Sequence, residues 1–599
     1  MTIIARSIAI LATLGVAMTI SVAAQDIHTE VDVKYNETPQ LREINKLNQS
    51  ATLNIPKGKV VKMPYSTSDV RIAVPSTITT LEPVAYGDTI YTSPYRGYAS
   101  LGFMPKYNTS LTAGYKFLDT DRSRLNAWLQ YDGTSYKGAR MQLFDSESES
   151  KLYVRSHSVT LGGSLHQAIG DESFFDAGVD YTYAHYNTPV FPETDNQGVH
   201  RLNASMLWNI NHKGLSYGVG GEYGHFAYVN HTGYQLYNNN GSEFLPENPM
   251  RENHFQFNGF VHGQILGASL AGVDIAFSHN SYEKTFKVVP VEMRSELLAI
   301  PQERNRLTTL SLTPFYNFAL GQVKLDLGLQ IDLTFNAGKT FHIAPKVNAI
   351  WEASEFFRVY AKATGGTWAN TLGSLYDVTP YAMPYQSFRN SHIPFDGEIG
   401  LTIGSYKGFY AELSASYAIA NDWVMPQMTS LVYPNGVVES AQSKVVTDFA
   451  AINFSGYRIH GALGYNWRNI VEVKASIDLA PQKVDKGYYL WRDRAKTVVA
   501  ANLKVTPIKP LDIELGWEYR GGRSIYSAVA DVSGVNATYQ WGLSSLGSIN
   551  NLNAGARYRI NSQWSAFLRG ENLINHHSLM VGGMPSQGIT GLIGVSYKF

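Results

Sequence analysis

Apolar and polar residues alternate over long stretches of this chain, and the segment 322–335 shows the pattern most clearly. Its odd positions from 323 onward are all apolar, whereas its even positions carry Lys324, Asp326, Gln330 and Asp332. Side chains of a β-strand point alternately to its two faces. The segment is therefore predicted to be a strand whose odd-numbered face is apolar and meets lipid, and whose even-numbered face is polar.

The same alternation recurs in the segments 175–183, 409–419, 471–479 and 511–519. Helical spacing, with apolar residues at i, i+3 and i+4, fits none of these segments. A tilted strand needs roughly 9–11 residues to cross a bilayer, whereas strands of soluble sheets are usually about 5–6 residues long. These segments are long enough to cross a bilayer, so they favour a transmembrane sheet over a soluble sandwich.

Short and long connections alternate between the predicted strands. Tight turns are predicted at 119–121, 211–214, 266–268, 353–355, 405–408, 468–469 and 561–563. Longer polar connections are predicted at 133–150, 230–251, 281–303, 369–391, 421–441 and 524–546. Transmembrane barrels have short periplasmic turns at one end and longer external loops at the other. The pattern therefore predicts an all-β fold, a transmembrane antiparallel β-barrel.

Counting the alternating segments gives about 22 strands between Arg96 and Phe599, an even number as in single-chain bacterial barrels. Residues 443–467 allow two interpretations: one long strand with a bulge at Ser455 and Gly456, or two short strands. Only the single long strand leaves both ends of the barrel on the periplasmic side. We assign residues 96–599 to the barrel.

Two segments precede the barrel. Arg6, an apolar run from 8 to 20 and the small residues Ala23 and Ala24 are typical of a cleavable secretory signal. We predict a signal peptide at 1–24, with the mature chain beginning near Gln25. Residues 25–95 contain six prolines, which disfavour helices and central strands. This stretch is predicted to be an extended, irregular periplasmic segment.

The C-terminal residues alternate too, with Ile593, Val595 and Phe599 on one face of a predicted closing strand. Aromatic residues elsewhere gather at strand ends. Rings with a polar edge settle at the headgroup level of a membrane, so these positions are predicted to mark its two boundaries. They are Trp351, Phe356, Phe357, Trp467 and Trp564 near tight turns, and Trp368 and Trp423 near long loops.

Composition narrows the chemistry. Lys plus Arg equals Asp plus Glu, at 49 each, so no basic field indicates nucleic acid. Cysteine is absent, which excludes disulfides, thiolate metal sites and cysteine nucleophiles. No stretch beyond the N-terminus is long and apolar enough for a membrane helix.

No residue is assigned a catalytic, cofactor-binding or metal-binding role from the sequence, so no enzyme and no cofactor is expected. His262 and His460 fall within predicted strands, where a lumen-facing or interfacial role is simpler. His576 and His577 are adjacent, so on a strand they would point to opposite faces and would form a poor metal pair. The acidic run 145–149 is interpreted as a solvated loop. The glycines of 218–221 lie in a predicted strand rather than at a strand-to-helix turn, so they form no phosphate loop.

The ending 571–575, Glu-Asn-Leu-Ile-Asn, followed by a closing strand, resembles the end of TonB-dependent receptors. The motifs at 30–33 and 96–102 resemble more closely a Bacteroidota group of plug-less, receptor-like barrels. The terminal Phe599 resembles the sorting signal read by the barrel-insertion machinery. The resemblance implies a location in the cell outer membrane. True receptors carry a folded plug ahead of the barrel, and a TonB box can be read at 29–33, but a box with no plug behind it has nothing to pull.

Two function classes follow from the sequence. In the first, the protein is a channel or receptor for solute passage or binding. In the second, it is a non-transporting subunit or scaffold of an envelope complex. The expected partners are outer-membrane lipid and lipopolysaccharide, and the insertion machinery. A wide polar lumen also needs an occluding element, which the sequence allows to be infolded loops, the 25–95 segment or an envelope protein partner.

Overall fold

The computed structural model describes most of the chain from Tyr95 to the C-terminus. The described ranges are 95–104, 107–139, 151–187, 196–230, 236–237, 243–244, 249–265, 269–283, 304–335, 338–381, 388–405, 408–432, 444–480, 482–484, 495–531, 538–580 and 584–599. The predicted signal peptide, nearly all of the 25–95 segment and the acidic run 145–149 lie outside these residues.

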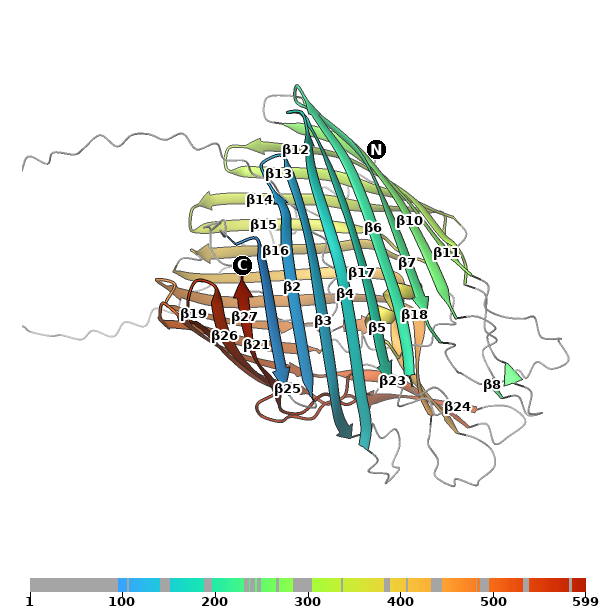
Figure 1. The fold of residues 1–599 in the computed structure, drawn as a ribbon. Coiled ribbons are helices and arrows are strands. Elements are labelled where there is room, and N and C mark those ends of the chain that lie inside the picture. Colours follow the sequence, from blue (N-terminus) through green and yellow to red (C-terminus); the bar gives the residue numbers. More distant parts are fainter. Residues whose placement is uncertain are drawn as a thin grey trace, which may run out of the picture. The chain divides into compact units, whose positions relative to one another are not determined.

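Antiparallel strands make up nearly all of the described chain (Figure 1). The first half contains β1 (Gly97–Met104), β2 (Asn108–Asp119), β3 (Ser123–Ala139), β4 (Lys151–Ile169), β5 (Ser173–Asn187), β6 (Asn196–His212), β7 (Leu215–Tyr228), β8 (Leu236–Tyr237), β9 (Glu243–Phe244), β10 (Arg251–Gln264), β11 (Leu270–Tyr282), β12 (Leu307–Leu320), β13 (Val323–Phe335) and β14 (Phe341–Ser354). The second half contains β15 (Phe357–Trp368), the helix α2 (Leu372–Val378), β16 (Ser391–Gly404), β17 (Phe409–Val432), β18 (Lys444–Trp467), β19 (Val471–Leu479), β20 (Gln482–Val484), β21 (Thr497–Ile508), β22 (Leu511–Gly521), β23 (Ser524–Asp531), β24 (Thr538–Ser545), β25 (Ile549–Arg559), β26 (Trp564–Glu571) and β27 (Thr590–Lys598).

The strands close into a ring. β27 pairs with β26 on one side and with β1 on the other, and the backbones of Gly97 and Phe599 exchange two hydrogen bonds. Three strands of the ring are interrupted near the loop end, so β19 continues into β20, β22 into β23, and β24 into β25. Counted this way, the described residues form a closed barrel of 22 strands. The predicted fold class and strand number are confirmed.

The turns and loops lie at opposite ends of the barrel, as predicted, but three predicted loops are too long. Strand β3 runs to Ala139, β17 runs to Val432, and β23 and β24 occupy much of 524–546. β2 and β3, β6 and β7, β14 and β15, and β25 and β26 are joined by tight turns at the end where Gly97 meets Phe599. The residues 443–467 lie in one long strand, β18. The predicted bulge at Ser455 and Gly456 is wrong, because the irregularity lies at Asn421 and Asp422 of β17, which oppose the single residue Asn453.

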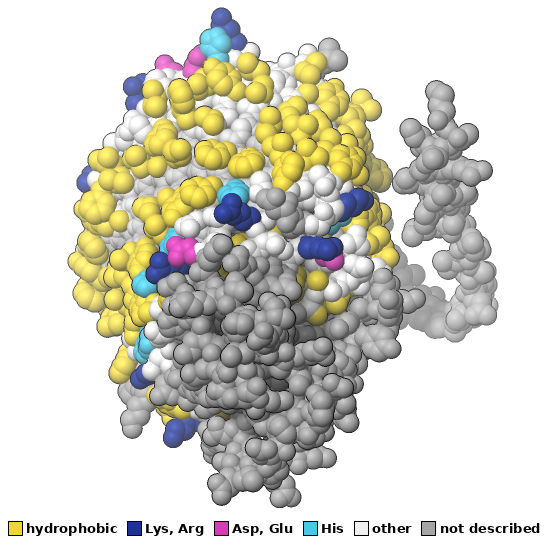
Figure 2. Space-filling view, turned by 90° about the vertical axis from the view of Figure 1, so that its right-hand side faces the viewer, with side chains coloured by type: hydrophobic (Ala, Val, Ile, Leu, Met, Phe, Trp, Pro, Cys, Tyr) yellow, Lys and Arg dark blue, Asp and Glu magenta, His cyan; other side chains and the backbone are white. Residues whose placement is uncertain are grey.

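The two faces of the strands differ as the alternation predicted. On β13, Leu327 and Leu329 are exposed on the outer face, whereas Asp332 and Thr334 are 1% and 2% exposed on the inner face. Large apolar side chains are exposed in the same way on most strands around the ring, and Figure 2 shows them as a broad hydrophobic belt. In the described part of the chain, no helix has the length and apolar character needed to cross a membrane.

The predicted aromatic positions at the turn end are exposed on the outer surface. Trp351, Phe356, Trp467 and Trp564 are between 43% and 59% exposed beside their turns. At the C-terminus, the ring of Phe599 stacks on Tyr597 and Tyr115 at centroid distances of 5.8 and 6.0 Å. These rings border the hydrophobic belt, as expected for side chains with mixed polar and apolar character.

Candidate functional site in the barrel lumen

The inner faces of the strands carry paired charges. Lys324 on β13 contacts Glu352 on β14 at 3.0 Å, and Arg458 on β18 contacts Asp478 on β19 at 3.2 Å. Further pairs join Asp274 to His262 and Lys346, Glu398 to Lys362, Glu514 to Lys504, Glu518 to Arg520, and Asp512 to Arg559. Charge inside a protein is costly unless it is paired or solvated. The lumen wall is therefore polar along much of the ring.

One cavity of about 270 Å³ lies in this wall. Tyr360 lies beside it, with its hydroxyl donating to Glu398 at 2.6 Å and Lys362 above its ring at 4.8 Å. The lining residues come from β14 to β18 and are Asn348, Ile350, Arg358, Tyr360, Lys362, Thr402, Glu412, Ser414 and His460. Both charge signs occur here, so the cavity suits a polar solute and selects no single charge.

The connection from β15 to β16 folds into the lumen, and we name residues 369–381 the infolded segment. It contains the short helix α2, whose first turn is capped when the Thr371 hydroxyl accepts a hydrogen bond from the Ser374 N–H at 3.0 Å. The helix ends at Thr379, where the backbone becomes extended ahead of Pro380. Because proline cannot continue a helix, Pro380 limits α2 to its seven residues.

Two charged contacts hold α2 against strands on another part of the ring. Asp377 accepts a hydrogen bond from the Arg201 guanidinium on β6 at 2.6 Å, with the two side chains 29% and 21% exposed. Glu252 on β10 is 5% exposed, and its carboxylate accepts the Leu372 N–H at 2.5 Å. A carboxylate at a helix N-terminus satisfies a free N–H and is favoured by the helix dipole.

The first residues of the infolded segment are tied down separately. The Arg304 guanidinium donates to the Asn370 carbonyl at 3.1 Å. The Asn370 amide donates to the Arg389 carbonyl at 2.5 Å and to the Ser391 hydroxyl at 2.9 Å. The entry and exit of the connection are therefore joined to each other as well as to the wall.

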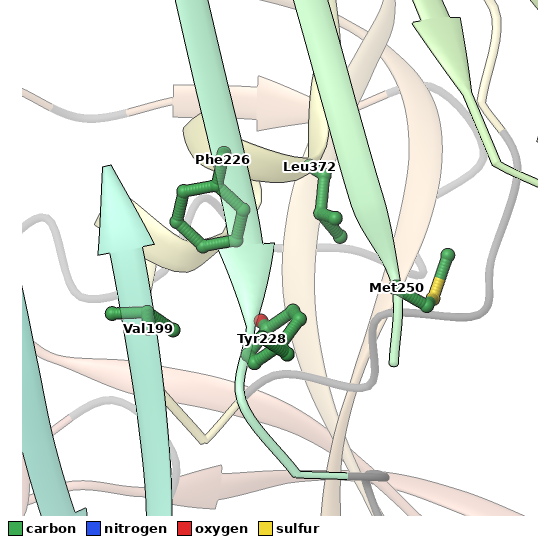
Figure 3. Close-up of a cluster of buried hydrophobic side chains, with 5 residues drawn as sticks. All are labelled: Val199, Phe226, Tyr228, Met250 and Leu372. Carbon is green, nitrogen blue, oxygen red and sulfur yellow. The ribbon is translucent and has the colours of Figure 1, made fainter. Parts of the chain in front are cut away.

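Apolar packing fixes the same helix. Leu372 is fully buried, and it packs with Val199, Phe226, Tyr228 and Met250 from β6, β7 and the residue before β10 (Figure 3). Burying a leucine side chain contributes about 1.5–3 kcal/mol. The contact is thus comparable in strength to the charged ones.

The other side of the infolded segment reaches different walls. Leu375 packs with Phe449 of β18 in a second buried cluster. Tyr381 packs against a third cluster, which combines Val154 of β4 with Ile525, Leu546 and Met584. The segment therefore contacts strands from both halves of the barrel, and it crosses the lumen near the loop end.

The last connection, between β26 and β27, lies beside the infolded segment, because Tyr381 packs against the cluster that contains Met584. The Asn572 amide donates to the carbonyls of His576 and Gln587, each at 2.9 Å, which folds this connection on itself. The Tyr136 hydroxyl on β3 donates to the Pro585 carbonyl at 2.9 Å. Together with the infolded segment, this connection narrows the lumen.

The buried tyrosines of this region are held in their neutral form. Burial raises the pKa of Tyr376 far above its usual value, an effect that the nearby Arg201 opposes and Asp377 reinforces. Burial also raises the pKa of Tyr381 well above its usual value, with smaller contributions from Tyr136 and Tyr376. Their hydroxyl groups stay protonated at physiological pH, so they act as hydrogen-bonding and packing groups.

The histidines considered in the sequence lie in separate places. His262 and His460 are on inner faces and contact Asp274 at 2.7 Å and Asp478 at 2.9 Å. His576 and His577 lie in the final connection, outside any strand. Within the described ranges, no group of three or more His, Asp or Glu residues is placed to hold a metal ion. The glycines of 218–221 lie in β7, as predicted.

The infolded segment itself was missed as a specific element. The sequence placed 369–391 among the long loops and named infolded loops only as one of several occluding elements. A capping threonine followed by Leu372 and Leu375 was the available signal for a short helix with a buried face. Nothing in the sequence indicated which strands this face would meet.

Comparison with known proteins identifies the architecture. No family model matches the chain, and no curated protein matches it. Solved structures do. A variant of the ferric enterobactin receptor of Pseudomonas aeruginosa in complex with enterobactin has a TM-score of 0.63 at 11% identity, covering 84% of this chain and 81% of that chain.

Two further structures are similar. The siderophore receptor PirA of Acinetobacter baumannii has a TM-score of 0.61 at 10% identity, covering 84% of this chain and 80% of that chain. The ferripyoverdine receptor of the outer membrane of Pseudomonas aeruginosa, bound to ferripyoverdine, has a TM-score of 0.57 at 11% identity, covering 84% and 72%. At these identities the similarity establishes a shared barrel fold.

Proposed function

We propose that this protein is an outer-membrane barrel that binds or passes a polar solute, and that the infolded segment is the gate of its lumen. The observation that carries the proposal is the crossing of a polar, charge-paired lumen by α2. It is held by Arg201, Glu252 and two apolar clusters.

The membrane placement rests on the outer surface. A broad belt of exposed apolar side chains surrounds the barrel, and exposed apolar surfaces of this extent mark contact with a membrane or a partner. Closed barrels satisfy all backbone hydrogen bonds between strands, which permits them to span a bilayer. The structurally similar receptor for ferripyoverdine comes from an outer membrane, which supports the same location here.

The polar lumen supports transport over a purely structural role. A polar, charge-paired interior is one that hydrated solutes can enter. The cavity beside Tyr360 offers hydrogen-bond donors and acceptors of both charge signs. We therefore expect the solute to be polar, and we assign closure of the lumen to the infolded segment.

Solute flux tests this function. Full-length protein is reconstituted into liposomes, and the entry of small neutral, cationic and anionic solutes is compared between the wild type and the Asp377→Asn variant. Asp180→Asn, on the inner face of β5 and bonded to Asn203, is the matched control. The proposal expects slow flux in the wild type and in Asp180→Asn, and a several-fold faster flux in Asp377→Asn. Equal flux in all three would contradict the gate, and a stable envelope partner with no flux in any variant would favour the scaffold.

A further inference from the structure

Five histidines lie on the outer face of neighbouring strands near the loop end. They are His157 on β4, His185 on β5, His200 on β6, His225 on β7 and His279 on β11. We name them the histidine row. None of them takes part in the lumen contacts described above. Figure 2 shows histidine, basic and some acidic side chains along the border between the hydrophobic belt and the loop end.

The hydrogen-bond partners place the row on the outside. The Nδ1 atom of His157 lies 2.9 Å from the Tyr131 hydroxyl, and that of His200 lies 2.5 Å from the hydroxyl of Tyr181, which is itself exposed. The Nδ1 atom of His225 lies 2.9 Å from the Asn253 amide oxygen. The Nδ1 atom of His279 lies 2.8 Å from the Thr308 hydroxyl. Because the Nδ1 atoms of these four histidines are engaged by neighbours, the Nε2 edge of each ring is the one that can reach an external acceptor.

The strand register shows that the row runs parallel to the plane of the membrane. His157 pairs directly with His185, but His200 pairs with Tyr183, two residues closer to the turn end than His185. His225 on β7 lies two residues closer to the turn end than Ala227, the partner of His200. Between β7 and β10 there is no such shift along the row, because His225 pairs directly with Asn253. His279 on β11 again lies two residues closer to the turn end than Ser281, the partner of Asn253. Six residues of slip over five strand steps correspond to roughly 20 Å along the strands for roughly 24 Å across them. The row is therefore inclined by about 40° to the perpendicular of the strands, which is the inclination of a level line on a barrel whose strands tilt by that angle.

The row also lies at a defined height. Each of its histidines is 9 to 12 residues from the turn end of its strand. A strand needs roughly 9–11 residues to cross a bilayer. Since the apolar side chains lie between the row and the turns, the row marks the outer boundary of the membrane-spanning surface.

The surroundings of the row are positively charged. Lys137 on β3, Arg155 on β4 and Arg251 on β10 share its face. Among the described residues of β3 to β12 and the ends adjoining them, the one acidic side chain on this outer face at this height is Glu283, which contacts Arg251 at 3.4 Å. Trp351, Trp467 and Trp564 border the turn end on other strands, β14, β18 and β26.

We propose that the histidine row, with Lys137 and Arg155, binds the phosphate groups of phosphorylated lipids in the surrounding outer leaflet. Imidazole N–H groups, a guanidinium and an ammonium are all donors to phosphate oxygen, and they stand where headgroup phosphates lie. The proposal rests on the membrane placement of the proposed function. It adds a specific lipid site on β3 to β11 that the solute path does not require.

Bound lipid A tests the proposal. Full-length protein in mixed micelles is titrated with lipid A carrying two phosphates and with the same lipid after removal of both. The test variant is Arg155→Gln/His157→Gln/His185→Gln. The control variant is Arg122→Gln/His212→Gln/Lys213→Gln, which removes an arginine, a histidine and a lysine at the turn end. Each variant is first checked for a heat-modifiable barrel that inserts into liposomes.

The wild type and the control should bind the phosphorylated lipid more tightly than the dephosphorylated one. The test variant should lose about fivefold in affinity through the lost charge of Arg155, and its preference for phosphate should fall accordingly. Equal binding of the two lipids by the wild type, or an unchanged preference in the test variant, would overturn the proposal. Failure of the wild type to insert into liposomes would instead contradict the proposed membrane function.

Discussion

An arginine scan of two adjacent residues tests the assignment of the barrel faces. Ile275 on β11 is 47% exposed on the outer face and lies five residues from Leu270, the first residue after the turn. With a rise of about 3.3 Å per residue and a tilt of about 40°, it sits roughly 13 Å into an apolar band about 25 Å tall. Ile275 is therefore close to the midplane.

Ile275→Arg should lower the free energy of unfolding by about 2–4 kcal/mol, the cost of an arginine facing lipid at the midplane. The neighbouring Ala276 faces the lumen, where it pairs with Asn258 and Ser311 and lies two residues from Asp274. Ala276→Arg should cost less than about 1 kcal/mol, because its guanidinium meets water and a carboxylate. Gly328 also faces the lumen, but a Cβ atom there would meet the Lys346 carbonyl oxygen at 3.0 Å, so Ala276 is the cleaner control.

The assay is reversible urea unfolding in lipid vesicles, followed by tryptophan fluorescence. The difference between the two variants carries the result, since both add the same charged side chain to the same strand. Equal changes in the free energy of unfolding would mean that the two faces of β11 contact the same solvent. A larger cost for Ala276→Arg would reverse the assignment of the faces.

Three further predictions concern other parts of the molecule. Deleting Phe599 removes the ring that packs over Gly97 and the pair of backbone hydrogen bonds that joins β1 to β27 at this end. The yield of heat-modifiable barrel should therefore fall sharply, and an unchanged yield would show that closure of the barrel does not need its last residue. Leu375→Ala should destabilise the infolded segment by about 2–3 kcal/mol and expose it to protease added from outside, while the thermal unfolding of the barrel stays within a few degrees; protection equal to the wild type would show that Leu375 does not anchor the segment. Mature protein should begin near Gln25 by N-terminal sequencing of outer-membrane fractions, and a chain that keeps residues 1–24 in the inner membrane would refute the predicted signal.

The wall of the barrel could be predicted because its signal is local. Alternation along 322–335 reports the two faces of β13 directly, since each residue contributes one side chain to one face. Turn positions were equally readable, because short polar stretches interrupt the alternation. The bulge was misplaced because Ser455 and Gly456 suggested local irregularity, while the actual two-against-one arrangement depends on the partner strand at Asn421 and Asp422.

The lumen contacts could not be predicted in this way. Arg201 and Asp377 are 176 positions apart, and Glu252 and Leu372 are 120 apart. Which strand faces which loop depends on closure of the whole ring, and a polar inward residue looks the same whether it meets water or a loop. The histidine row has the same limitation, since its level arrangement emerges only once the register of six strands is fixed.

Single-channel recording tests the central claim, that the infolded segment closes a membrane-spanning polar lumen. Wild-type full-length protein and the Arg201→Gln variant are inserted separately into planar lipid bilayers at the same salt concentration. The Arg201–Asp377 contact is a partly buried, charge-assisted hydrogen bond at 2.6 Å, and its loss should cost the closed state about 1.5–3 kcal/mol. We predict a mostly closed wild type and an open probability at least tenfold higher in Arg201→Gln. Large, continuously open currents from the wild type, or closed behaviour in both proteins, would contradict it.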